Sequence, residues 1–145
     1  MIYDKDCICR MNVYSKIYKG HYLEMKSFFE DYADIIMKHH LRRDGEMFYT
    51  FNQLTETLDV ELEIFQATKE YISVLDTNVR FYSYYCIENM LSTVITNDFD
   101  KIQLNYAEIV EYMRAQNRVE SSNTYTEIHS NGTQKYIILK IGERI

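Results

Sequence analysis

The chain has no proline, no tryptophan and only four glycines among its 145 residues. No stretch has the Pro-, Gly- or Ser-rich composition of an interdomain linker, so we predict a single domain over residues 1–145. Phosphate-binding loops and nucleophile elbows need glycines at fixed spacings, and neither these motifs nor HExxH occurs in the sequence. The sequence therefore predicts neither an enzyme nor a bound cofactor.

Long apolar runs are lacking as well. The most apolar stretch, residues 136–139, is far shorter than the roughly 20 residues of a membrane-spanning helix. Residues 1–6 lack the basic region and apolar run of a secretory signal. We expect a cytoplasmic protein with no membrane contact.

The three cysteines are an odd number, which favours free thiols in a reducing compartment over a disulfide framework. Cys7, Cys9, His39 and His40 are residue types that bind zinc. Structural zinc sites usually have cysteines two to four residues apart, whereas Cys7 and Cys9 alternate on one face of a strand. We therefore predict no metal site, and the roles of Cys7, Cys9 and Cys86 stay open.

The net charge of −6 is unevenly distributed along the chain. Residues 1–103 carry 17 acidic and 11 basic side chains, while residues 104–145 carry five of each. A negative surface opposes phosphate, so any DNA contact is favoured in the C-terminal third.

Apolar spacing predicts most of the elements. Steps of three and four residues predict helices at about 22–40, from 61, at 87–95 and from 105 to 116. Thr50, with Gln53 three residues later, has the arrangement of a capping box, which predicts a short helix to residue 58. Residues 7–18 are typical of an extended segment. The alternation at 125–129 and 136–141 around Asn131-Gly132 predicts a β-hairpin. The expected fold class is α+β, mainly helical, with about four to five helices and a C-terminal β-hairpin.

Two segments suggest DNA-binding motifs. A short helix, a turn and a longer helix at residues 50–75 have the order of a helix-turn-helix. The run 105–110, with Gly132 and residues 136–138, resembles the winged-helix domains of plasmid and phage regulators. That resemblance implies a recognition helix at about 121–130, where alternation predicts a strand instead.

The first hypothesis is a small winged-helix-like DNA-binding regulator of a phage, plasmid or other mobile element. Its DNA contacts would come from basic and amide side chains near the C-terminus. These candidates are Arg114, Arg118, Asn123, Lys135 and Lys140.

The alternative is a non-enzymatic protein-interaction or inhibitory module of phage or viral origin. The chain has fourteen tyrosines, and the consecutive aromatic residues at 81–85 would face all sides of a predicted helix, which leaves some rings exposed. Tyrosine is enriched at interfaces, so an acidic, Tyr-rich surface suits a protein partner or a second copy in a homodimer. A helix at 121–130 would favour the regulator, and a strand there would favour the interaction module.

Overall fold

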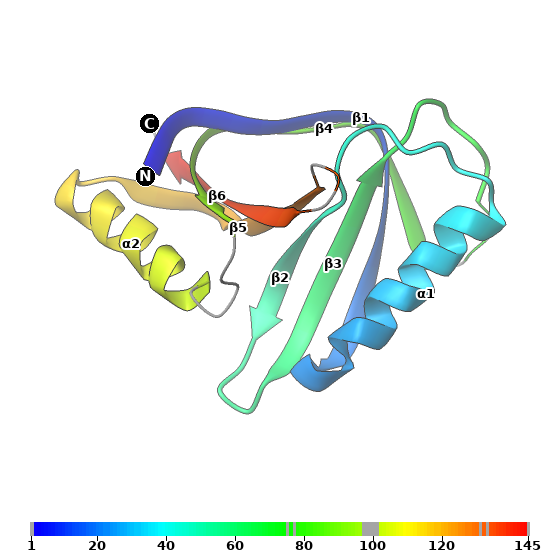
Figure 1. Cartoon of the computed structure of the whole chain (residues 1–145), viewed down its shortest axis with the longest axis horizontal. Helices are drawn as coiled ribbons and strands as arrows, with labels where there is room; N and C mark the ends of the chain where they lie inside the picture. The colour runs from blue at the N-terminus through cyan, green and yellow to red at the C-terminus, as the bar shows by residue number, and fades with distance from the viewer. Residues whose placement is uncertain are drawn as a thin grey trace. The chain divides into compact units, whose positions relative to one another are not determined.

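The computed structural model describes residues 2–74, 76, 78–96, 102–130, 132 and 134–144. Within them the chain forms six strands, two α-helices and one short 3-10 helix (Figure 1). In chain order they are β1 (Ile2–His21), η1 (Tyr22–Glu24), α1 (Met25–Lys38), β2 (Phe48–Leu54), β3 (Asp59–Ala67), β4 (Val79–Ile95), α2 (Ile102–Ala115), β5 (Val119–Ser130) and β6 (Lys135–Arg144).

The chain divides into two compact units, and the long strands β1 and β4 contribute to both. We call residues 10–85 the α1 unit, and residues 1–9 together with 86–145 the α2 unit.

In the α1 unit, β3 pairs antiparallel with β1 on one side and with β2 on the other. Alternate residues of a strand point to opposite faces, so Leu62 and Ile64 lie on the same face of β3. That face packs with Tyr32 and Ile36 of α1 in one buried apolar cluster. Figure 1 shows α1 lying along this sheet. The residues that alternate with Leu62 and Ile64 therefore lie on the opposite face of the sheet, away from α1.

In the α2 unit, β6 pairs antiparallel with both β4 and β5. Ile109 and Met113 of α2 are buried against Leu91, Leu139 and Ile141 of this sheet. Helix spacing of Ile109 and Met113, four residues apart, places both on the face that meets the strands.

The predicted hairpin is confirmed, because β5 and β6 pair from Thr124↔Ile141 to Ser130↔Lys135. Gly132 has the positive φ of 98° that such a turn requires. Asn131 lies outside the described residues. The predictions of an extended segment at 7–18 and of helices at 22–40 and from 105 are also confirmed, by β1, α1 and α2.

The expectation of a mainly helical fold is wrong, because residues 50–54, 61–67 and 87–95 lie in the strands β2, β3 and β4. In β3 the burial of Leu62 to Ala67 on both faces imitates the apolar stripe of a helix. In β4 the residues Met90 to Thr93 are likewise buried in succession, after a positive φ at Asn89 that interrupts regular alternation.

The predicted helix-turn-helix and winged-helix motifs are therefore excluded, because the helices that they require are absent. Residues 50–54 and 59–67 form the antiparallel strands β2 and β3, joined by a turn in which Leu58 has a positive φ. Residues 121–130 belong to β5, so no recognition helix exists there. The predicted capping box at Thr50 is also absent, and His21 with Glu24 forms such a box instead.

The expected free thiols are wrong in part. Cys9 and Cys86 form a disulfide, and Cys7 is the free, exposed cysteine. The two are 77 positions apart in sequence, so their proximity depends on the arrangement of β1 and β4. Among the described residues, neither helix combines the length and the hydropathy needed to cross a membrane.

Candidate functional site

The face of the α1 unit opposite α1 carries a buried carboxylate, Glu63. Leu62 and Ile64 pack beneath α1, so strand alternation turns Glu63 and its neighbours Glu61 and Phe65 to the other face. Glu63 lies opposite Ile17 in β1 and opposite Thr50 in β2. A carboxylate thus occupies the central strand of this sheet.

Few hydrogen bonds hold Glu63 in place. The residue is only 7% exposed. The Ser15 hydroxyl donates to its Oε2 at 2.8 Å, and the Asn52 amide donates to its Oε1 at 3.4 Å. No described lysine, arginine or histidine lies within ion-pair distance of this carboxylate. Burying an ionised group without an opposite charge is costly, so Glu63 is suited to accept a cationic or hydrogen-bond-donating group.

Aromatic rings occupy the same unit beside this carboxylate. Phe65, two positions after Glu63, stacks on Phe48 with ring centroids 4.7 Å apart. Tyr85 lies 4.9 Å from the Phe65 ring and 6.0 Å from the Phe48 ring. Aromatic faces carry negative potential and attract cations. Three rings and one carboxylate therefore share a chemical preference for positive charge.

An open groove of about 740 Å³ lies in the α1 unit. Its lining includes Lys19 and Glu61, which form an ion pair at 3.5 Å, and Asn52, which also contacts Glu63. Arg80 lies at the groove as well, where a hydrogen bond with Tyr82 raises its pKa and the charges of Glu63 and Glu61 act in the same direction. The groove has the size of a small-ligand site, and Asn52 links it to the buried carboxylate.

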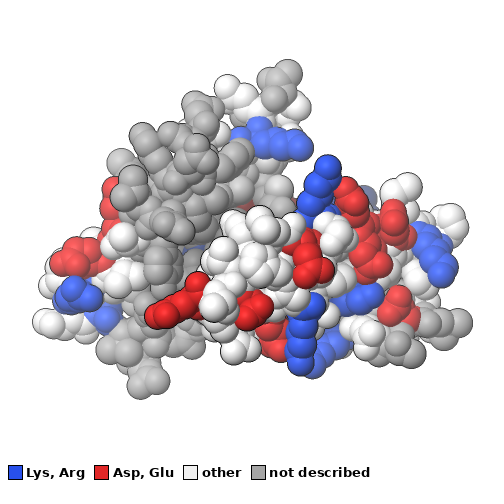
Figure 2. Space-filling model, turned by 90° about the horizontal axis from the view of Figure 1, so that it is seen from below, with Lys and Arg blue, Asp and Glu red and all other residues white. Residues whose placement is uncertain are grey.

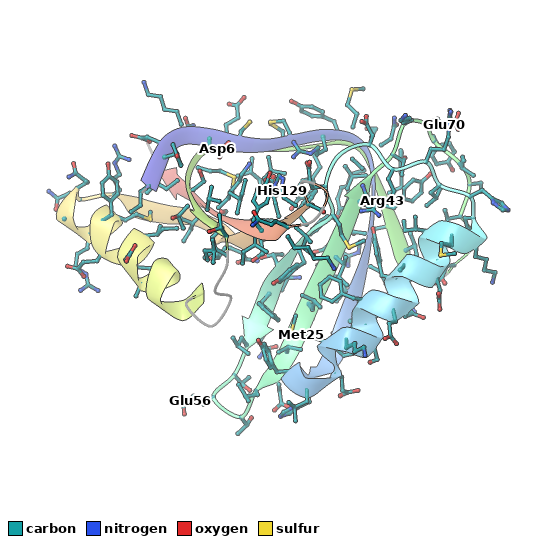
Figure 3. The ribbon with its side chains drawn as sticks, in the orientation of Figure 1. Asp6, Met25, Arg43, Glu56, Glu70 and His129 are labelled. Atoms are coloured by element: carbon teal, nitrogen blue, oxygen red, sulfur yellow. A yellow bond between two sulfur atoms is a disulfide. The ribbon has the colours of Figure 1, made fainter. Side chains whose placement is uncertain are left out.

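The α2 unit holds a separate charged network. The Lys140 ammonium, 7% exposed, lies 3.0 Å from Glu127 and 3.3 Å from Asp6, and donates to the Cys7 carbonyl at 2.8 Å. His129 Nε2 lies 3.0 Å from Glu127. Figure 3 labels Asp6 and His129, at the two ends of this series of contacts.

Each carboxylate of this network has a basic side chain within ion-pair distance. Burial opposes ionisation of Asp6, but hydrogen bonds from the Cys7 amide and the Ser92 hydroxyl, together with the Lys140 charge, lower the pKa of this carboxyl overall. Glu127 is 2% exposed and already meets Lys140 and His129. We therefore assign this network a structural role and take the Glu63 face as the candidate site.

The five predicted DNA contacts are spread over several elements. Arg114 is exposed on α2 and pairs with Glu111 at 3.4 Å. Arg118 pairs with Asp4 at 3.0 Å, and Lys140 is buried as described. Asn123 in β5 and Lys135 at the start of β6 are exposed. Their contact with DNA stays a prediction, although the charges of Arg118 and Lys140 are already balanced by carboxylates.

Charge on the described surface is mixed. Figure 2 shows lysine and arginine side chains interspersed with aspartate and glutamate over the described part of the face in view. Such a pattern differs from the basic stripe that is typical of a duplex-binding surface.

Sequence reasoning missed Glu63 because residues from 61 onward were expected to be helical. The signal was present in the alternation Glu61-Leu62-Glu63-Ile64, which is typical of a strand with one polar and one apolar face. The pairing of Glu63 with Ser15 and Asn52 had no signal in the sequence.

The chain belongs to the family described as "Domain of unknown function (DUF5085)", whose model matches residues 9–143. No curated protein sequence matches the chain significantly.

Several solved structures have a similar fold. The crystal structure of the EcmrR C-terminal domain is 9% identical, with a TM-score of 0.72 over 97% of this chain and 98% of that domain. EcmrR in the cryo-EM EcmrR-DNA complex has a TM-score of 0.73 at 9% identity, and the match covers 97% of this chain but only 57% of EcmrR. A structure described as a hydrolase from Listeria innocua has a TM-score of 0.62 at 11% identity, covering 97% and 91%. At these identities the likeness shows the fold alone.

Proposed function

We propose that this chain is a non-enzymatic ligand-binding domain with a regulatory role, and that Glu63 receives the positively charged group of a small organic ligand. The observation that carries the proposal is the burial of Glu63 in hydrogen-bond contact with Asn52, a residue that lines the groove, with a second hydrogen bond from Ser15 and no ion pair among the described residues.

The ligand class follows from the surroundings of Glu63. An ionised carboxylate is an acceptor only, and the three rings of Phe48, Phe65 and Tyr85 add a further preference for cations. The groove volume of about 740 Å³ accommodates a molecule of drug-like size. An aromatic cation carries a positive charge that complements the Glu63 carboxylate and a ring that can pack against aromatic side chains.

The regulatory role is supported by the likeness to EcmrR. The chain matches nearly all of the EcmrR C-terminal domain and only 57% of the EcmrR chain seen with DNA. We therefore propose that this chain supplies ligand binding, and that regulation of DNA depends on additional elements or on a partner protein.

The absence of enzymatic activity is part of the proposal. Ser15 is fully buried, and its hydroxyl donates its proton to a hydrogen bond with the Glu63 carboxylate, so we assign it a role in orienting that carboxylate. Neighbouring structures described as hydrolases share the fold at 11% identity, which does not carry an activity over.

The test uses naphthylmethyltrimethylammonium as an aromatic cation, naphthalenemethanol as its neutral match and naphthaleneacetate as an anion. Isothermal titration calorimetry should show preferential binding of the cation. Glu63→Gln removes the charge while keeping the side-chain shape, and should weaken cation binding by about tenfold or more, since a desolvated cation-carboxylate pair is worth on the order of 1.5–3 kcal/mol.

Glu70→Gln is the matched control, because it removes an exposed carboxylate that pairs with Arg42 (Figure 3). It should leave cation binding unchanged. Equal effects of the two substitutions, or preferential binding of the anion, would contradict a cation site at Glu63 and point instead to Lys19 and Arg80.

Direct DNA binding by the chain itself is the second candidate, favoured by the likeness to DNA-bound EcmrR and by the exposed basic residues Arg114 and Lys135. Fluorescence anisotropy with a labelled duplex across a salt series separates the candidates. A DNA-binding chain loses affinity linearly in log salt, and Lys135→Ala reduces that slope by about one. We expect no salt-dependent binding by the isolated chain.

A further inference from the structure

We propose that Cys9, Cys86 and Glu88 form a redox-controlled zinc site in the α2 unit, which binds Zn²⁺ when the Cys9–Cys86 disulfide is reduced and releases it on oxidation. The proposal does not depend on the Glu63 site, which lies in the α1 unit.

The geometry brings three ligand atoms together. The Cα atoms of Cys9 and Cys86 are 4.0 Å apart, and the two sulfurs and a Glu88 carboxylate oxygen all lie within 4.8 Å of one another. Glu88 follows Cys86 by two positions in β4, so strand alternation places both side chains on one face. The backbone thus presents the ligands together without requiring a loop to close.

The ligand chemistry fits zinc. Two thiolates and a carboxylate are ligands that zinc accepts at about 2.0–2.3 Å, within tetrahedral geometry. Three protein ligands leave the fourth position to water, and the exposure of Glu88 gives the ion a route from solvent. Magnesium and calcium prefer oxygen ligands, so the two sulfurs favour a thiophilic metal.

Reduction and metal binding are separate steps. A dithiol reductant supplies two electrons and two protons to the disulfide and itself becomes a disulfide, which leaves Cys9 and Cys86 as thiols. Zn²⁺ then displaces the two thiol protons to solvent and binds both thiolates. A small-molecule disulfide accepts two electrons from the thiolates and two protons from solvent, becoming two thiols, while the Cys9–Cys86 bond reforms, two ligands are lost and the ion is released.

Cys7 provides an internal comparison. It precedes Cys9 by two positions, is exposed and carries the third thiol of the chain. Its sulfur is not one of the three clustered ligand atoms. A site at Cys9, Cys86 and Glu88 therefore does not require Cys7.

The experiment uses the full chain, reduced with dithiothreitol and desalted without oxygen, and titrated with Co²⁺ and then Zn²⁺. We expect one ion per chain, a sulfur-to-cobalt charge-transfer band in the near ultraviolet and the loss of this band when zinc displaces cobalt. Cys86→Ser should abolish the band, and Glu88→Gln should weaken zinc binding by about tenfold or more while keeping the band.

Cys7→Ser is the matched control and should bind as the unaltered chain does. The unaltered chain oxidised with diamide should bind neither ion, a comparison that does not depend on how any variant folds. Equal metal binding by the oxidised chain, or loss of the cobalt band in Cys7→Ser, would overturn the assigned ligand set. Absence of the band in the reduced, unaltered chain would overturn the site itself.

Discussion

The two buried glutamates of the described residues, Glu63 and Glu127, have opposite surroundings. Glu127 contacts a buried ammonium and an imidazole, whereas Glu63 has hydrogen bonds but no ion pair. A buried carboxylate with ion-pair partners supports the fold, and one that lacks a partner at ion-pair distance is available to a ligand. This difference at the level of single residues separates the structural network from the candidate site.

At this scale we predict a large effect of Lys140→Ala. The substitution leaves Glu127 and Asp6 without their shared cation, and breaking a buried ion pair in this way lowers the free energy of unfolding by about 3–5 kcal/mol. Lys135→Ala, at an exposed position of the same strand, should change it by about 0.5 kcal/mol or less. Urea denaturation measures both, and equal losses would refute a structural role for the Lys140 network.

At the scale of elements, the contact between α1 and its sheet depends on tyrosine hydroxyls. Tyr32 in α1 donates to the Tyr14 carbonyl at 2.8 Å, and Tyr18 in β1 donates to Asp31 at 2.7 Å. Tyr14 in turn exchanges hydrogen bonds with the backbone of Ile72. Burial raises the pKa of Tyr32 and of Tyr18, and the Asp31 carboxylate raises that of Tyr18 further.

These directions predict alkaline unfolding of the α1 unit. A pKa raised in the folded state gives stability that is present below the unfolded pKa of about 10 and lost as pH rises above it. Each such tyrosine removes about 1.4 kcal/mol per pH unit there. Tyrosinate absorbance and far-ultraviolet circular dichroism should therefore change together above about pH 10.

Tyr18→Phe removes one ionising group and should make the stability fall less steeply with alkaline pH. Tyr71→Phe, at a position 60% exposed, is the control and should leave the slope unchanged. A slope that is the same in the Tyr18→Phe variant would show that this hydroxyl does not contribute to the transition.

Element prediction succeeded where local chemistry is decisive. Asn131-Gly132 between alternating segments predicted the β5–β6 hairpin, and the spacing of Phe28, Tyr32 and Ile36 predicted α1. It failed at β3, where apolar steps of three and four residues outweighed the alternation of Glu61 to Ile64, and at β4, where the positive φ of Asn89 interrupts the alternation.

At the scale of the whole molecule, the fold is shared with proteins of 9–11% identity, including the EcmrR C-terminal domain and a Listeria innocua protein described as a hydrolase. Apolar patterning that preserves a fold leaves most surface and site residues free to change. The function proposed for this chain therefore depends on Glu63 and its neighbours rather than on the fold.

The predictions of a homodimer, a cytoplasmic location and a mobile-element or viral source stay predictions. The DNA contacts proposed for Arg114, Arg118, Asn123, Lys135 and Lys140 also await the salt-series measurement. The winged-helix arrangement that motivated them is excluded, because its recognition segment is strand β5.

The sequence by itself determined the hairpin, the two helices, the first strand and the lack of known catalytic motifs, since each depends on residues within a few positions of one another. Only the tertiary structure decided that the chain is mainly β, that Cys9 meets Cys86 and that Glu63 is buried without an ion pair among the described residues. Strand pairing and the disulfide join residues that are far apart in the chain. Local sequence patterns therefore do not predict with which distant strand a given strand pairs.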